Sequence, residues 1–207
     1  MQQQQTKQKA MYLAGGLAAL FVLTSVASWL VTEVYVKRDD RGVVRRMAGW
    51  FPIAKVGGQT VRYGQFLKSR DAIETFLQSK AVKDAGGAGQ QLTPQIEKSA
   101  YDRLLREAAA RELAAEKKIT VNDQDVKDTY DRFVAQASST VPDVKQYIQD
   151  TFHWTVEEYQ QIVVRPQTID DKLAATFATG TDGYNQLNEY YITRLEKPDV
   201  KRYFTFE

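Results

Sequence analysis

The sequence TPQIEKSAYDRLLREAAARELAAEKK at residues 93–118 determines the class of domain that we expect. Thr93 is a typical helix N-cap, and Pro94 occupies the first turn, where its missing N–H has no intrahelical partner to lose. Apolar side chains then recur along one side of the predicted helix: Ile96, Ala100, Tyr101, Leu104, Leu105, Ala108 and Leu113. We therefore expect a long helix that reaches about Lys118 and packs within a mainly α-helical domain.

Helical patterns continue on both sides of this segment. Before it, apolar spacing predicts a helix over 64–84, and the glycine-rich residues 85–89 predict a break. After it, Asn122 is expected to cap a helix whose apolar residues are Val126, Tyr130, Phe133, Val134 and Ala137. A short helix is expected after Pro142, with apolar residues Val144, Tyr147, Ile148 and Phe152.

The last third of the chain contains a second strong helix start. Thr155-Val156-Glu157-Glu158 is a capping box, and the helix that it begins should extend to Phe177. Pro166 should kink this helix because proline cannot donate a backbone hydrogen bond. We expect a loop over 179–183 and a final helix from Tyr184 to Leu195.

A small β element is predicted before these helices. Ile53–Val56 and Gln59–Tyr63 are β-prone runs on either side of Gly57-Gly58, which is typical of a tight hairpin. The tail Val200–Phe206 is also β-prone. Because isolated hairpins are marginally stable, we expect this tail to add a third strand beside Gln59–Tyr63.

An uncharged run near the N-terminus predicts a membrane segment. Met11 to Val31 reads MYLAGGLAALFVLTSVASWLV, which is long enough to cross a bilayer as one helix. We expect a disordered cytoplasmic tail at 1–10 and a transmembrane helix at 11–36. An alternative is a cleaved signal peptide, because Ser25-Val26-Ala27 resembles a small-x-small cleavage site.

Residues 37–51 are expected to form a basic amphipathic segment beside the membrane. Four of their side chains are candidates for contact with lipid: Arg41, Arg45, Arg46 and Trp50. A solvated connector that packs on its own domain would have the same sequence pattern. The five Lys and Arg residues of this flank, against two in the tail, favour a cytoplasmic domain, although long domains translocate largely regardless of charge.

Composition excludes several kinds of chemistry. The net charge of +2 gives no nucleic-acid footprint, and the absence of cysteine excludes disulfides and thiolate sites. His153 is the only histidine, so we expect it to cap or pack rather than to ligate a metal. The adjacent pairs Asp39-Asp40 and Asp170-Asp171 are expected on solvated faces. We predict no catalytic, cofactor-binding or metal-binding residues, and no enzyme activity.

Three segments, taken in order, resemble a known family. They are PIAKVGGQTVRYGQFL at 52–67, SAYDRLLREAAARELAAEKKITVNDQDVKDTYDRF at 99–133 and YIQDTFHWTVEEYQQIVVRPQTIDDKL at 147–173. They are similar to the SurA-type N-terminal domain of the periplasmic and cell-surface chaperones SurA, PpiD and PrsA. Related chaperones usually carry a parvulin-type prolyl isomerase domain, but too few residues follow Leu173 here to form one, and they contain no histidine. The resemblance therefore implies the chaperone half alone, and the alternative is that the sequence is a fragment of a longer foldase.

The resemblance implies a function for residues 52–207. It implies a membrane-anchored, extracytoplasmic, ATP-independent chaperone that binds unfolded or exported polypeptides, with membrane lipid as a second partner and without isomerase activity. It places the N-terminus in the cytoplasm and the domain outside, against the flanking charge count. The alternative is a non-catalytic scaffold or adaptor in a cell-envelope complex. The sequence assigns no client-binding residue, because core and cradle residues have the same identities.

Overall fold

The computed structural model describes residues 24–37, 42–84, 91–138, 141–204 and 206. The chain divides into two compact units, Met1–Trp50 and Phe51–Glu207, here called unit 1 and unit 2. The expected tail at 1–10 and most of the expected membrane segment at 11–36 lie outside the described residues. Within the ranges that the structure describes, no helix is both long enough and apolar enough to cross a membrane.

Unit 1 is helical over most of its described part. Residues 24–31 form an α-helix, which continues as the π-helix η1 (Thr32–Lys37). The next helix, α2 (Gly42–Ala48), lies within residues 37–51, where a basic amphipathic segment was expected.

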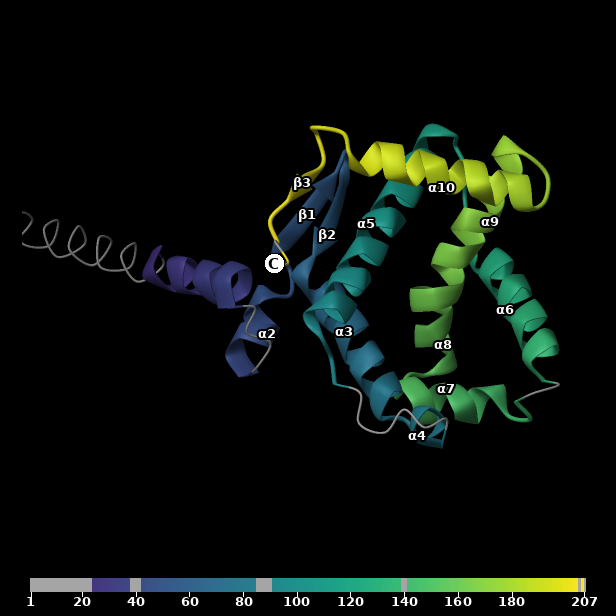
Figure 1. The fold of residues 1–207 in the computed structure, drawn as a ribbon, viewed down its shortest axis with the longest axis horizontal. Coiled ribbons are helices and arrows are strands. Elements are labelled where there is room, and N and C mark those ends of the chain that lie inside the picture. The colour runs from purple at the N-terminus through teal and green to yellow at the C-terminus, as the bar shows by residue number, and fades with distance from the viewer. Residues whose placement is uncertain (1–23, 38–41, 85–90, 139–140, 205, 207) are drawn as a thin grey trace, which may run out of the picture. The chain divides into compact units, whose positions relative to one another are not determined.

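Unit 2 is mainly helical with a small sheet, as expected (Figure 1). Its α-helices are α3 (Tyr63–Gln78), α4 (Lys80–Asp84), α5 (Pro94–Glu116), α6 (Asp123–Ala137), α7 (Val144–Phe152), α8 (Val156–Tyr159), α9 (Arg165–Phe177) and α10 (Thr181–Leu195). A π-helix, η2 (Gln160–Val164), joins α8 to α9. The strands are β1 (Pro52–Val56), β2 (Gln59–Arg62) and β3 (Lys201–Arg202).

The sheet confirms the hairpin and corrects the position of the third strand. β1 and β2 pair in antiparallel fashion across Gly57-Gly58, with Ala54 opposite Val61. β3 pairs with β1, so the strand order is β2-β1-β3. Our expectation that the tail would lie beside Gln59–Tyr63 was therefore wrong: the free edge of β1 accepts it instead, and the Tyr203 backbone N–H donates to the Ile53 carbonyl oxygen at 3.0 Å.

Aromatic rings fix the returning tail to the centre of unit 2. Phe204, which is 3% exposed, lies edge-on to Tyr63 and Phe66, with ring centroids 5.7 and 5.5 Å away. It also stacks on Tyr101 of α5 at 5.9 Å. The Tyr101 hydroxyl donates to the Ile53 carbonyl oxygen at 3.1 Å, so α5, α3, the sheet and the tail share one core.

Helix boundaries agree with the predicted caps and differ where backbone geometry intervenes. Thr93, Asn122 and Thr155 each accept a hydrogen bond from the first turn of the helix that follows, as expected. The helix expected over 64–84 is divided into α3 and α4 at Ser79, whose backbone is extended. Pro166 lies in the first turn of α9, and the π-helix η2 interrupts the expected single helix directly before α9.

The loop expected over 179–183 is shorter than predicted. α10 begins at Thr181, directly after Gly180, which has a positive φ of 65°. A Cβ on Gly183 would lie 2.4 Å from the Ala174 carbonyl oxygen of α9. Glycine at this position therefore allows the first turn of α10 to approach α9 closely, and the loop is reduced accordingly.

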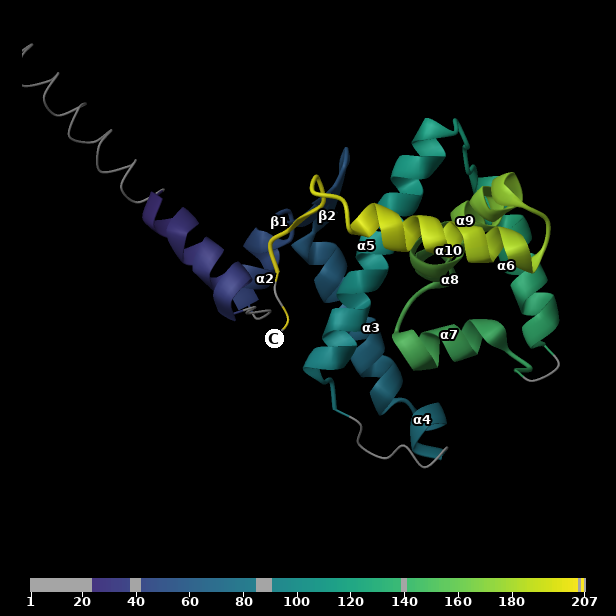
Figure 2. The same ribbon diagram turned by 45° about the horizontal axis from the view of Figure 1, so that its top comes forward.

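The helices of unit 2 form a closed circuit. α3 packs on both α5 and α7, the chain returns through α8 and η2, and α9 packs on α5 and α10. Figure 1 shows α5 between the sheet and α9, with α10 along one end. Figure 2 agrees with Figure 1 in placing α6 on the side of α9 that faces away from α5. This circuit positions the cavities described next.

Candidate functional site

An apolar cavity lies inside this helical circuit. Its volume is about 500 Å³, within the range of roughly 300–1,000 Å³ typical of ligand pockets. It is lined by Ser69, Ala72, Ile73, Phe76, Ile96, Ser99, Ala100, Arg103, Phe152, Trp154, Tyr159 and Val163. We call it the aromatic cavity. Most of its lining is apolar, so it is suited to apolar side chains of a guest.

Stacked rings form much of the lining. The Phe76 and Phe152 ring centroids are 6.2 Å apart at an interplanar angle of 14°, and those of Phe152 and Trp154 are 5.3 Å apart at 22°. Tyr159 lies 6.1 Å from Phe152. Because aromatic pairs favour such offset stacking, the rings hold one another in place and present a pre-formed apolar surface. Phe76 is 37% exposed and so remains accessible.

A left-handed residue positions two of these rings. His153 has φ 55° and ψ 31° and is the C-cap of α7, where its backbone N–H donates to the Gln149 carbonyl oxygen at 3.0 Å. This conformation ends α7 sharply. Phe152 before it and Trp154 after it can therefore both line the aromatic cavity. The prediction of a capping role for His153 is confirmed.

Two smaller cavities adjoin the aromatic cavity between α5 and the segment η2–α9. One, of about 190 Å³, shares Ser69 and Arg103 with the aromatic cavity. The other, of about 370 Å³, shares Arg103 and Val163 with it and includes the amide side chains of Gln167 and Asn188. Arg103 is therefore common to all three cavities.

The cavity of 190 Å³ is positively charged, and we call it the basic cavity. Its charged lining residues are Lys68, Arg103, Arg111, Arg165 and Glu107. Two of the cations are well paired, because Lys68 binds Glu158 at 3.0 Å and Arg165 forms an ion pair with Asp123. Arg103 and Arg111 both face Glu107, at 3.5 and 3.8 Å. One carboxylate thus serves two guanidinium groups.

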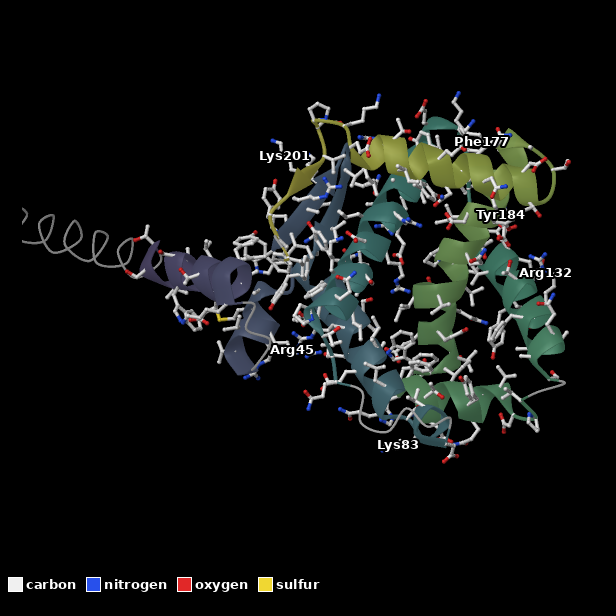
Figure 3. All side chains as sticks on the ribbon, viewed as in Figure 1. Arg45, Lys83, Arg132, Phe177, Tyr184 and Lys201 are labelled. Carbon is white, nitrogen blue, oxygen red and sulfur yellow. The ribbon has the colours of Figure 1, made fainter. Side chains whose placement is uncertain are left out.

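The cavity of about 370 Å³, here called the third cavity, is lined by Asp170, Tyr184 and Tyr191, and the sequence did not predict the tyrosine partners of Asp170 and its neighbour Asp171. The Asp170 carboxylate accepts a hydrogen bond from the Tyr191 hydroxyl at 2.5 Å, and burial raises the pKa of Asp170. Asp171 accepts from Tyr184 at 2.6 Å, and this bond raises the pKa of Tyr184 to about 12. Figure 3 shows Tyr184 and Arg132, which also approaches Asp171, on the same side of unit 2.

Of the two aspartate pairs expected on solvated faces, the structure describes only Asp170-Asp171, and the prediction for Asp170 was wrong. Asp170 is half-buried rather than on a fully solvated face, and the Tyr191 hydroxyl of α10 donates to one of its carboxylate oxygens. Asp39-Asp40 lies outside the described residues. In the part of the chain that the structure describes, no group of three or more His, Cys, Asp or Glu side chains is arranged to hold a metal ion.

The candidate lipid contacts belong to unit 1 and take no part in these cavities. Arg45 of α2, labelled in Figure 3, is exposed, as is Arg46, and Trp50 is 63% exposed. Arg41 lies outside the described residues. Val43 and Met47 of α2 are exposed as well, whereas Val44 is buried. The exposed side chains of α2 therefore include both basic and apolar groups.

The sequence missed the residues of the aromatic cavity as a set. Phe76 is far in the chain from Phe152, Trp154 and Tyr159, and aromatic residues at such positions also fit the core of a helical domain. The one local signal was the triplet Phe152-His153-Trp154, in which a helix-ending residue separates two large rings. Comparisons of the chain with protein-family models, with curated proteins and with solved structures give no match.

Proposed function

We propose that the protein is a chaperone that binds apolar segments of unfolded polypeptides in the aromatic cavity, without ATP and without prolyl isomerase activity. The observation that carries this proposal is the accessible cavity of about 500 Å³ lined by stacked Phe76, Phe152 and Trp154. Burial of apolar surface contributes about 25 cal/mol per Å², so a few side chains give weak, reversible binding. The resemblance to SurA-type chaperone domains supports the same function.

A pair of phenylalanine variants tests this proposal. Phe76 and Phe133 are both helical and both 37% exposed, but only Phe76 lines the aromatic cavity. The full chain should suppress aggregation of an unrelated chemically unfolded protein. Phe76→Ser should raise the concentration needed for half suppression about threefold or more, whereas Phe133→Ser should leave it unchanged. Circular dichroism melts check that both variants fold.

Three results would contradict parts of this proposal. Equal effects of Phe76→Ser and Phe133→Ser would show that suppression does not use the cavity. Absence of suppression by the wild-type chain would contradict the chaperone function and favour the alternative of a non-catalytic adaptor. Catalysed cis/trans exchange of a proline peptide would contradict the proposed absence of isomerase activity.

We further propose that residues 11–36 anchor the protein in a membrane, with residues 1–10 in the cytoplasm and residues 37–207 outside. The uncharged run Met11–Val31 and the exposed Arg45, Arg46 and Trp50 support this arrangement. Protease added to intact spheroplasts should digest the domain. Protection of the domain until the membrane is broken would invert the orientation and contradict an extracytoplasmic function.

A further inference from the structure

The polar groups around the aromatic cavity indicate which polypeptide segments it selects. Arg103 lines both the aromatic and the basic cavity, and its side chain is 43% exposed. Its Nη2 atom donates to the Ser69 hydroxyl at 3.1 Å, and its Nε atom lies 3.5 Å from Glu107. A guanidinium has five N–H donors, so donors remain available on Nη1 and Nη2.

The charge beside Arg103 is incompletely balanced. Arg103, Glu107 and Arg111 are spaced four residues apart and therefore lie on one face of α5. The ion-pair distances of 3.5 and 3.8 Å exceed those of charge-assisted hydrogen bonds, which are about 2.7–2.9 Å. Burial also raises the pKa of Glu107. Two guanidinium groups thus share one loosely bound carboxylate, so a second carboxylate could form an ion pair with them.

We propose that the guest is a polypeptide segment in which apolar or aromatic residues are followed closely by an acidic side chain. The apolar residues occupy the aromatic cavity, and the acidic side chain binds Arg103, with Arg111 behind it. This inference rests on the proposed chaperone function and adds a charge requirement to it.

The surroundings of Arg103 favour a polypeptide over a fatty acid. The carboxylate of a fatty acid ends the molecule, so such a ligand would terminate at Arg103. Arg103 also lines the third cavity, together with Gln167 and Asn188. The Gln167 amide nitrogen donates to Asp171 and the Asn188 amide oxygen accepts from Arg106, so the Gln167 oxygen and the Asn188 nitrogen are the amide atoms that could pair with the backbone of a chain extending past the arginine.

Matched peptides test the charge requirement. Three fluorescent peptides share one apolar run with two aromatic residues, followed by glutamate, glutamine or lysine at the same position. Their affinities are measured by fluorescence anisotropy with the full chain in nanodiscs of neutral lipid. We expect the glutamate peptide to bind about fivefold more tightly than the glutamine peptide, and the lysine peptide to bind most weakly. Because the pair is partly exposed, high salt should reduce this preference.

Two arginines of α5 give the variant and its control. Arg103→Gln should abolish the preference for glutamate, so that the glutamate and glutamine peptides bind the variant with equal affinity. Arg106→Gln should retain the preference, because Arg106 lines only the third cavity and donates to Asn188 at 3.3 Å. Arg111→Gln should reduce the preference in part, which keeps the test valid if Arg103→Gln fails to fold.

Each contrary outcome has a distinct meaning. Equal affinity of the glutamate and glutamine peptides would overturn the charge requirement and leave the chaperone function intact. A preference that survives Arg103→Gln would also overturn it. If none of the peptides binds, or if oleate binds where they do not, both the charge requirement and the chaperone function are wrong.

Discussion

Arg194 of α10 binds Glu112 of α5 through two hydrogen bonds, from Nε to Oε2 at 2.6 Å and from Nη2 to Oε1 at 2.9 Å. The same guanidinium holds both carboxylate oxygens of Asp199, at 3.0 and 2.8 Å. These partners raise the pKa of Arg194. One side chain therefore fixes the last helix to the central helix and directs the chain toward β3.

The first prediction concerns the planarity of this guanidinium. Arg194→Lys should lower the free energy of unfolding by about 1–2 kcal/mol, because an ammonium keeps the charge but cannot bind two carboxylates in bidentate fashion. Arg132→Lys is the control, since the Arg132 side chain is 70% exposed. Denaturant unfolding measures both variants. Equal stability of Arg194→Lys and the wild type would show that charge alone suffices.

The second prediction concerns the hairpin turn that packs on Glu112. Gly57 has φ 52°, and a Cβ built on it would lie 1.6 Å from Oε1 of Glu112. Gly57→Ala should therefore destabilise the fold by about 1–3 kcal/mol, through backbone strain and displacement of the carboxylate from Arg194. Gly58→Ala should have little effect, because a Cβ there meets nothing within 4 Å. A ranking of the two melting temperatures in the reverse order would contradict this account.

The third prediction concerns the tail. Phe204→Ala should lower the free energy of unfolding by about 3–5 kcal/mol, as is typical of a buried phenylalanine, and deletion of residues 198–207 should lower the melting temperature clearly. Lys201→Ala, an exposed change on β3, should have little effect. An unchanged melt after the deletion would show that the tail does not stabilise unit 2.

Local signals explain most of what the sequence predicted correctly. Thr93, Asn122 and Thr155 act within one turn of their own helices, so the helix starts did not depend on tertiary structure. The partner of β3 could not be derived in this way. A β-prone tail can pair with either edge of a hairpin, and the choice of β1 follows from the packing of Phe204 against Tyr63 and Tyr101.

The cavities required tertiary information throughout. Phe76, Phe152 and Trp154 meet only because α3 and α7 pack together, and their spacing is the same as that of core residues. Arg103 and Glu107 carry no local signal of a cavity in the sequence. Asp170 was expected on a solvated face because adjacent helical residues point in different directions, and nothing near it in the sequence indicates its contact with Tyr191 of α10.

The fourth prediction uses the half-buried position of Asp170. Burial raises the pKa of Asp170 in the folded protein, so folding favours the neutral carboxyl group. This contribution to stability is fully present below the pKa of the unfolded state, near 3.8. It is lost as the pH rises through the pKa of the folded state. Asp170→Asn removes this titration and keeps an oxygen acceptor for the Tyr191 hydroxyl. The stability of the variant relative to the wild type should therefore be highest near pH 7 and should decline as the pH is lowered toward 4.

Urea unfolding of both proteins at several pH values measures this difference, and Asp171→Asn, at a more exposed carboxylate, is the control. A relative stability of Asp170→Asn that rises on acidification would show that the Tyr191 hydrogen bond, which lowers the pKa of Asp170, outweighs burial.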